Sequence, residues 1–260
     1  MPRGINQFDE DRLDGLNVGD ANSSNIVSPG IVTDGLVLHL DAGNYQSYPI
    51  AGTTWYDLTS GNARGVLTDG PVYIRDGGGA IDFDGTNDYV SISNALYKNQ
   101  DFSVAFWVYH QTQNKSLVSI VDYSHAAGGT NRNWVIQSSD ANTNRYYYFG
   151  YFDGTSFQPT LGSGIGVQYT ADAWQYITYT KVGTSVRGYR NAVNVYSATA
   201  GNANVSYGAT NEVLFIGDVN VATPDRSFNG YISNLQLYNR ALTPTEVAQN
   251  FNATRARFNI

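Results

Sequence analysis

The sequence feature that most constrains the fold is an alternation of apolar and polar residues with a period of two. It recurs in about a dozen short segments, among them GLVLHLD (35–41), AIDFD (80–84) and WQYITYTK (174–181). Successive side chains of an extended strand point to opposite faces, so such a segment can bury one face and expose the other. Gly, Asn, Asp and Thr connect the segments, without helical patterns between them. This arrangement predicts an all-β fold, a two-sheet antiparallel sandwich.

The other predicted strands follow the same rule. They are 88–92, 102–109, 116–123, 133–138, 145–152, 184–190, 193–197, 213–217 and 229–238. The segment 145–152 (RYYYFGYF) places aromatic rings on both faces of one strand. We expect one set of rings to fill the sandwich, and the other to meet the second sheet, a neighbouring subunit or a sugar.

One short C-terminal helix is predicted. Thr243, Pro244 and Glu246 stand at the N-cap, first and third positions of a helix, the pattern of a capping box. Val247 and Phe251 lie one turn apart on a face that can dock against the sandwich. We also expect Arg240, at the end of the last strand, to bridge to a carboxylate.

Charge and composition exclude several functions. Charged residues are 14% of the chain, the formal net charge is −7, and lysine occurs three times. Binding along a nucleic-acid backbone or to anionic lipid needs a dense basic surface, so neither nucleic acid nor membrane is an expected partner. Cysteine is absent, which excludes disulfides and thiolate metal sites. The N-terminus lacks the apolar core of a secretory signal, so we expect synthesis in the cytoplasm without a leader.

Two regions are predicted. Residues 1–33 are polar and acidic and would form an extended N-terminal arm, a candidate assembly anchor, because they cannot bury enough apolar surface alone. Residues 34–260 would form the sandwich.

Enzymatic signatures are missing. Glycoside hydrolysis needs two carboxyl groups at a fixed separation, and the three glutamates of this chain, Glu10, Glu212 and Glu246, show no paired motif. No nucleophile elbow or phosphate-binding loop occurs, and the three histidines are scattered. The sequence predicts a protein that is not an enzyme.

Five ordered segments resemble the laminin G-like branch of the concanavalin A-like lectin/glucanase superfamily. They are GLVLHLDAGN (35–44), TTWYDLTSGNARGVL (53–67), GGAIDFDGTNDYVSI (78–92), FSVAFWVY (102–109) and FNGYISNLQLYNRALTPTEVAQNF (228–251). The resemblance implies a jelly-roll sandwich, in agreement with the strand pattern. Most of these motifs are structural, such as Gly85 in a turn after Phe83 and Asp84.

The chain also resembles structural proteins of tailed phages, including cyanophages. The features that carry this are LVLHLDAGN, the ending NFNATRARFNI, the lack of cysteine and the richness in Asn, Tyr and Thr. This implies a capsid or tail decoration protein of the virion, oligomeric in the assembly. Its partners would be other virion proteins through the arm, with host-surface glycans as a further ligand. A lectin-like adhesion module outside any virion is the alternative.

Carbohydrate binding would use aromatic and polar side chains on the loops 122–133 and 218–229. The predicted ligand-binding residues are Asp122, Tyr123, His125, Asn131, Arg132 and Arg226. No cofactor is predicted. Some relatives bind calcium through Asp side chains at the rim of the sandwich, and Asp84, Asn87, Asp88 and Asp122 are the candidates here, with hydrogen bonds to backbone amides as the competing interpretation.

Overall fold

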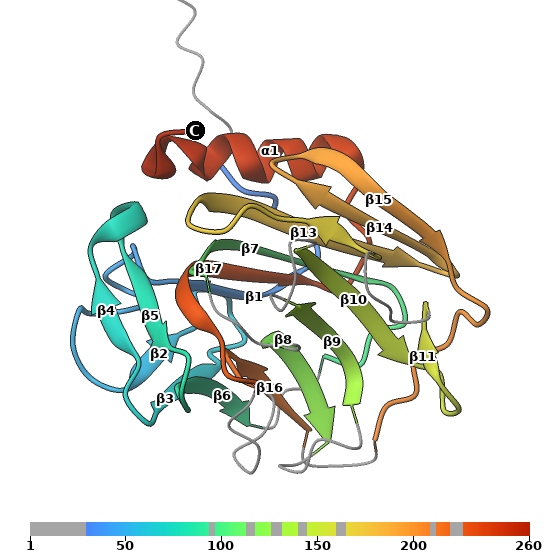
Figure 1. Cartoon of the computed structure of the whole chain (residues 1–260), viewed down its shortest axis with the longest axis horizontal. Coiled ribbons are helices and arrows are strands. Elements are labelled where there is room, and N and C mark those ends of the chain that lie inside the picture. Colours follow the sequence, from blue (N-terminus) through green and yellow to red (C-terminus); the bar gives the residue numbers. More distant parts are fainter. Residues whose placement is uncertain are drawn as a thin grey trace, which may run out of the picture.

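A computed structural model shows the predicted sandwich (Figure 1). It describes residues 30–93, 97–112, 118–125, 132–139, 145–159, 165–208, 212–218 and 226–260. Residues 1–29 of the predicted arm lie outside the described residues. No helix in the described part of the chain combines the length and apolarity that crossing a membrane requires.

The strands form two antiparallel sheets. Sheet A has the order β15 (Val193–Thr199), β14 (Ser185–Arg190), β13 (Trp174–Val182), β7 (Phe102–His110), β17 (Asn229–Tyr238), β5 (Ala80–Asp84) and β4 (Val72–Ile74), with β1 (Leu36–Asp41) also paired to β17. Sheet B has the order β11 (Phe157–Gln158), β10 (Tyr146–Phe152), β9 (Arg132–Ser139), β8 (Val118–His125), β16 (Glu212–Ile216), β6 (Tyr89–Ser93), β3 (Arg64–Thr68) and β2 (Thr54–Tyr56), with β12 (Val167–Gln168) paired to β10. Two 3₁₀ turns, η1 (Asp76–Gly78) and η3 (Arg255–Phe258), and the helix α1 (Pro244–Thr254) complete the described elements.

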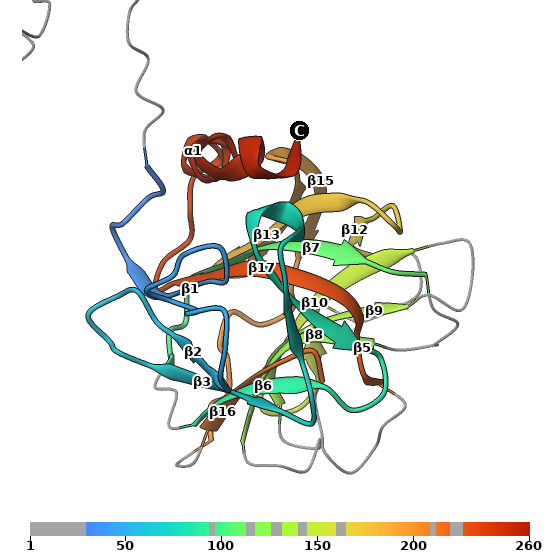
Figure 2. The same cartoon turned by 90° about the vertical axis from the view of Figure 1, so that its left-hand side faces the viewer.

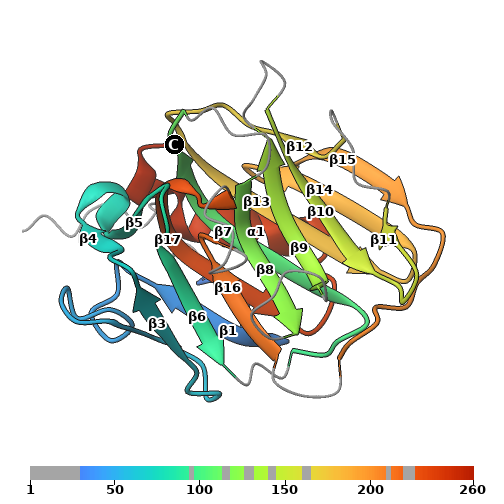
Figure 3. The ribbon, with the colours of Figure 1, turned by 60° about the horizontal axis from the view of Figure 1, so that its bottom comes forward.

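The core lies between the sheets, and sheet A is also covered on its outside. Along β7, Val104, Phe106 and Val108 face the core, whereas Ala105 and Trp107 belong to a separate apolar cluster with Phe251 of α1 and Phe258 of η3. Figure 2 shows α1 above sheet A, and Figure 3 shows sheet B on the opposite side of the molecule. The continuous apolar run FSVAFWVY therefore reflects a strand buried on both faces.

Most predicted elements are confirmed. The aromatic strand β10 sends Tyr147, Phe149 and Tyr151 into the core, as expected for rings that fill the sandwich. Gly85 has a φ of 76°, and a Cβ there would lie 2.8 Å from Cβ of Asn229, so the turn requires glycine. The pattern missed the strands β2, β4, β11 and β12, whose two or three residues give too little alternation to detect. It also missed β3, where one of the two buried positions is Gly65 and carries no apolar side chain.

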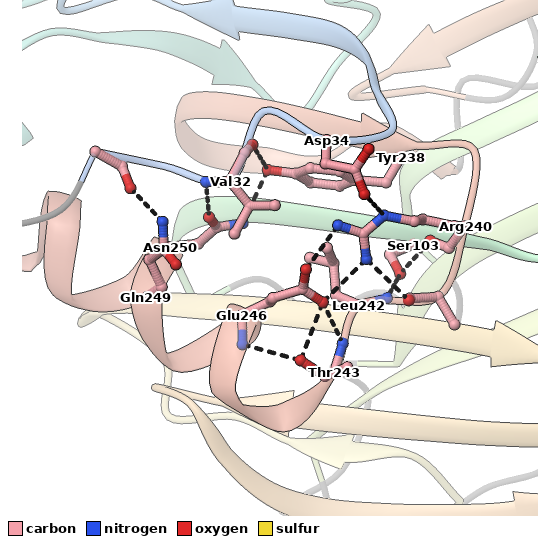
Figure 4. A network of polar contacts seen from close by, with 12 residues as sticks. Val32, Asp34, Ser103, Tyr238, Arg240, Leu242, Thr243, Glu246, Gln249 and Asn250 are labelled. Carbon is pink, nitrogen blue, oxygen red and sulfur yellow. Dashed lines mark hydrogen bonds and ion pairs between the residues drawn. The ribbon is translucent and has the colours of Figure 1, made fainter.

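The predicted helix cap and bridge are confirmed as one network (Figure 4). Thr243 Oγ1 accepts a hydrogen bond from Glu246 N, and Glu246 Oε2 accepts one from Thr243 N at 2.8 Å, which completes the capping box. Arg240 donates to both carboxylate oxygens of Glu246, at 2.9 and 2.6 Å, and its Nε lies 2.8 Å from Oδ2 of Asp34. One guanidinium thus joins the end of β17, the start of α1 and the residues before β1.

Residues 30–33, which the sequence analysis places in the arm, contact the sandwich. Val32 is buried, its N–H donates to Asn250 Oδ1 at 2.8 Å, and its carbonyl accepts from the Tyr238 hydroxyl at 2.9 Å. Gln249 Nε2 donates to the carbonyl of Gly30 at 2.8 Å. The chain therefore enters the fold along α1.

Replacing the bridging guanidinium should destabilise the fold. Arg240→Met removes both bonds to Glu246 and leaves that carboxylate half-buried, so we expect a loss of about 1–3 kcal/mol in the free energy of unfolding. Arg75→Met, at an exposed arginine, is the matched control and should change it by less than about 0.5 kcal/mol. Urea denaturation of both variants measures the difference, and equal losses would contradict the assigned role.

The same bridge should make stability depend on acidity. The hydrogen bonds from Arg240 lower the pKa of Glu246 from 4.5 to about 2. Because the folded state holds this proton less tightly than the unfolded state, the stabilisation is complete above pH 4.5 and is lost as the pH falls toward 2. Denaturation of wild type and Glu246→Gln between pH 6 and 2 should show a shallower decline for the variant. Parallel curves would contradict this account.

Candidate functional site

A groove with a volume of about 500 Å³ opens beside the edge of β1. Its lining combines three apolar side chains with six neutral polar ones: Ile31, Leu36, Leu58, Thr33, His39, Asn44, Gln46, Thr59 and Ser60. They come from the segment before β1, from β1 itself and from two loops at 44–46 and 58–60.

The alternation of β1 places His39 in this groove. Leu38 and Leu40 point into the core, so His39 between them points to the other face. Burial is the main cause that lowers the pKa of His39 below 6.5, and it outweighs the nearby carboxylates of Asp41 and Asp57. The imidazole is therefore neutral at pH 7.

Asp57 holds one wall of the groove. Its Oδ1 accepts the N–H groups of His39 and Thr59, both at 2.9 Å, and its Oδ2 accepts the Thr59 hydroxyl at 2.6 Å. The carbonyl of His39 accepts from Leu58 N at 2.9 Å. These bonds fix the loop 58–60 against β1, so this wall is formed before any ligand arrives.

The loop 42–48 forms the other wall and is similarly braced. Asp41 accepts two bonds from Nη1 of Arg257, both at 2.9 Å, and the Asp41 N–H donates to Ser47 Oγ at 3.0 Å. Asn44 Oδ1 accepts from Gln46 N at 2.9 Å, which closes a tight turn. The turn projects Tyr45 outward, and 70% of its surface is exposed.

The groove is suited to a neutral ligand with hydroxyl groups. Its lining contains no carboxylate, ammonium or guanidinium group, whereas amides, hydroxyls and an imidazole supply donors and acceptors. Leu36, Leu58 and Ile31 supply apolar surface. Tyr45, which lies in the chain between the lining residues Asn44 and Gln46, is an exposed aromatic residue. A sugar ring has the matching chemistry, with hydroxyls at its edge and C–H groups on its faces.

The structure places four of the predicted ligand-binding residues elsewhere, on strands of sheet B: Asp122, Tyr123, His125 and Arg132. Asp122 and Tyr123 lie within β8, which extends to His125, and both side chains are buried; their assignment to a loop was wrong. The Tyr123 hydroxyl donates to Glu212 Oε2 at 2.6 Å and accepts from Tyr97 N at 3.1 Å. Tyr123 thus packs in the core, and its ring is not available at the surface.

The other predicted residues are separated. His125 ends β8 and Arg132 begins β9, so their backbones lie at the same end of sheet B, and Asn131 lies outside the described residues. Arg226 is half-buried beside Ser227, in the region that follows β16. Because β16 runs antiparallel to β8, with Gly217 N bonded to the carbonyl of Ile120, this region starts at the opposite end of β8. The role of these residues in ligand binding stays a prediction.

Two of the four candidate calcium residues, Asp84 and Asp88, accept hydrogen bonds from the backbone. Asp84 Oδ1 accepts from Thr86 N at 2.7 Å, and Asp88 Oδ2 accepts from Asp84 N at 3.0 Å. Asp88 is buried, which raises the pKa of its carboxyl. Within the described ranges, no three His, Asp or Glu side chains gather as a metal site would require.

Sequence reasoning missed the groove. Its residues come from four separate stretches that only the folded chain brings together. Six of the nine lie in the segments 35–44 and 53–67, whose motifs are interpreted as structural. The one available signal is the turn Asn44–Tyr45–Gln46, which places an aromatic residue between two amides directly after a strand.

Comparison with solved structures finds the same fold in carbohydrate-active proteins. A sialidase from Trypanosoma rangeli in complex with sialic acid superposes with a TM-score of 0.62 at 16% identity, over 89% of this chain and 35% of the other. Domain 4 of an arabinanase from Geobacillus stearothermophilus, in complex with arabinotriose, gives 0.58 at 21% identity, over 83% and 97%. Botulinum neurotoxin type C, whose cell entry depends on two ganglioside molecules, gives 0.62 at 15% identity, over 85% and 51%. This chain spans about a third of the sialidase.

Sequence comparisons add the family. No curated protein matches the chain. The model of the concanavalin A-like lectin/glucanases superfamily matches residues 84–248, well over half of the chain and within the region of predicted resemblance. Together with the two-sheet fold, this match shows that the chain belongs to the concanavalin A-like lectin/glucanase superfamily.

Proposed function

We propose that the protein binds neutral glycans in the groove beside β1, without enzymatic activity, as a structural and adhesive component of a phage virion. The observation that carries the glycan-binding part is the neutral polar groove, with the exposed Tyr45 in the chain between two of its lining residues. The groove provides hydrogen-bonding groups on a wall that Asp57 holds in place, so a ligand meets groups that are already oriented.

The solved structures with a similar fold support a glycan as the class of ligand. The arabinanase domain is solved with arabinotriose, the sialidase with sialic acid, and the neurotoxin depends on gangliosides. The groove of this chain lacks a positive charge, so a neutral sugar fits it better than an acidic sugar such as sialic acid.

The lining also supports binding without catalysis. Glycoside hydrolysis needs an acid and a second carboxylate, and the groove lining contains neither Asp nor Glu. The nearby carboxylates of Asp41 and Asp57 are occupied by an arginine and by backbone amides. Incubation with a bound oligosaccharide should therefore leave it uncleaved.

The virion part rests on the resemblance of the sequence to tailed-phage structural proteins and on the acidic segment 1–29. The chain enters the fold along α1 at residues 30–33. Residues 1–29 would tether the sandwich to the particle, where other virion proteins are its partners. The alternative, a lectin-like module outside any virion, shares the groove but has no use for a tether.

Removing the exposed ring should weaken glycan binding. Tyr45→Ala removes the aromatic face while leaving the braced turn, so we expect the affinity for a neutral oligosaccharide to fall about tenfold. Tyr45→Phe keeps the ring and should bind within about twofold of wild type. Calorimetric titration against neutral hexose and pentose oligosaccharides measures both, and equal binding by all three proteins would refute the groove as the site.

Deleting residues 1–29 should abolish incorporation into particles and leave glycan binding unchanged. A variant lacking residues 1–29 retains Gly30–Thr33 and their bonds to α1 and β17, so it should fold and bind glycan like the full chain. It should be lost from purified particles, as measured by immunoblotting. Undiminished incorporation would contradict the tether, and lost glycan binding would place the site outside the groove.

A further inference from the structure

The strand β15 forms an open edge of sheet A. It is the last strand in the sheet order and pairs with β14 along one side. No described strand pairs with its other side. Val193 is 62% exposed and Val195 is 42% exposed, so apolar side chains stand beside this edge. An edge of this kind presents unpaired N–H and C=O groups that can accept another extended chain.

Charged residues and proline, which usually protect sheet edges, are missing from β15. Its sequence, VNVYSAT, contains neither. A bulge at Val195, where the register to β14 shifts, twists the strand and is the one protective feature. Beyond it, residues 196–199 remain in regular register with β14, and their outer edge can accept a partner chain.

The charge around this edge selects the partner. Residues 183–200, which contain β14 and β15, carry Arg187 and Arg190 and no acidic residue, although the chain as a whole has a net charge of −7. Arg190 donates to the carbonyl of Gln168 at 2.7 Å, whereas Arg187 is exposed. A positive edge on an acidic protein favours an acidic, extended partner over a second copy of the same edge.

The N-terminal segment of the chain has this chemistry. Residues 1–29 contain five acidic and two basic residues, with Asp9, Glu10 and Asp11 in succession. Fully extended, 29 residues span about 95 Å, enough to reach a neighbouring molecule. The segment joins the described part of the chain at Gly30, and Val32, two residues further on, belongs to the same apolar cluster as Tyr189 of β14.

We propose that β15 of one molecule binds the acidic segment 1–29 of a neighbouring copy, which links molecules head to tail. This inference rests on the proposed assembly role of residues 1–29 and is independent of glycan binding. A head-to-tail contact of this kind either closes into a ring or continues as a chain, because donor and acceptor are different surfaces.

Charge exchange tests the contact in the full-length protein. Wild type should self-associate in sedimentation equilibrium, more weakly as salt rises. Arg187→Glu should weaken association about fivefold or more, and Arg64→Glu, at an exposed arginine on β3, should not. Combining Arg187→Glu with Asp9→Lys, Glu10→Lys and Asp11→Lys should restore it. A wild type that stays monomeric, or a combined variant no better than Arg187→Glu alone, would overturn the proposal.

Cross-linking identifies the occupant, since the native chain contains no cysteine. A mixture of Val195→Cys and Asp11→Cys molecules should form disulfide-linked pairs under oxidation. The control mixture of Val66→Cys, exposed on β3, with Asp11→Cys should not. Linked pairs of Val195→Cys alone would show β15 binding its own copy and would overturn the assignment. Glycan binding measured on the same samples separates this outcome from a failure of the proposed function.

Discussion

Burial of the central strands of sheet A on both faces is the constraint on which the rest of the structure depends. The Trp107 ring stacks on Phe258 with centroids 3.9 Å apart, and its indole N–H donates to Thr254 Oγ1 at 2.8 Å. On the other face of β7, Phe106 packs against Tyr147 from sheet B. The elements α1 and η3 therefore cover one face of sheet A, and sheet B covers the other. Because β17 pairs with β1, β5 and β7, this doubly covered centre also positions β1 and the groove beside it.

Several carboxylates of the chain hold loops and helix ends in place by hydrogen bonds. Asp57 fixes one wall of the groove, Asp41 is clamped by Arg257 at the other, and Glu246 caps α1 while holding Arg240. A carboxylate that accepts several hydrogen bonds rigidifies the loops around it. The carboxylates near the groove are therefore bonded to Arg257 and to backbone amides. The surface left for a ligand includes neutral hydrogen-bonding groups and no charged side chain.

The fold could be predicted from the sequence, and the groove could not. Alternation is a local signal, so the longer strands, the capping box at Thr243–Glu246 and the bridge from Arg240 follow from short stretches of sequence. A groove depends on contacts between distant residues, such as Asp57 with His39, which no local pattern encodes. The predicted positions of Asp122 and Tyr123 failed for a related reason. The sequence analysis places both residues at the end of the strand 116–123 and also in the polar run 122–133, which looks like a loop. The strand β8 continues to His125, and Tyr123 is buried with Glu212 as its partner.

The central claim is that neutral glycans bind in the groove beside β1. Backbone amide shifts in NMR spectra, recorded while a neutral oligosaccharide is added to the isotopically labelled full chain, test it most directly. The account predicts saturable shifts concentrated at His39, at 44–46 and at 58–60. Shifts confined to the loops that join β8 to β9 and β16 to β17 would contradict it and would place the ligand at the opposite sheet.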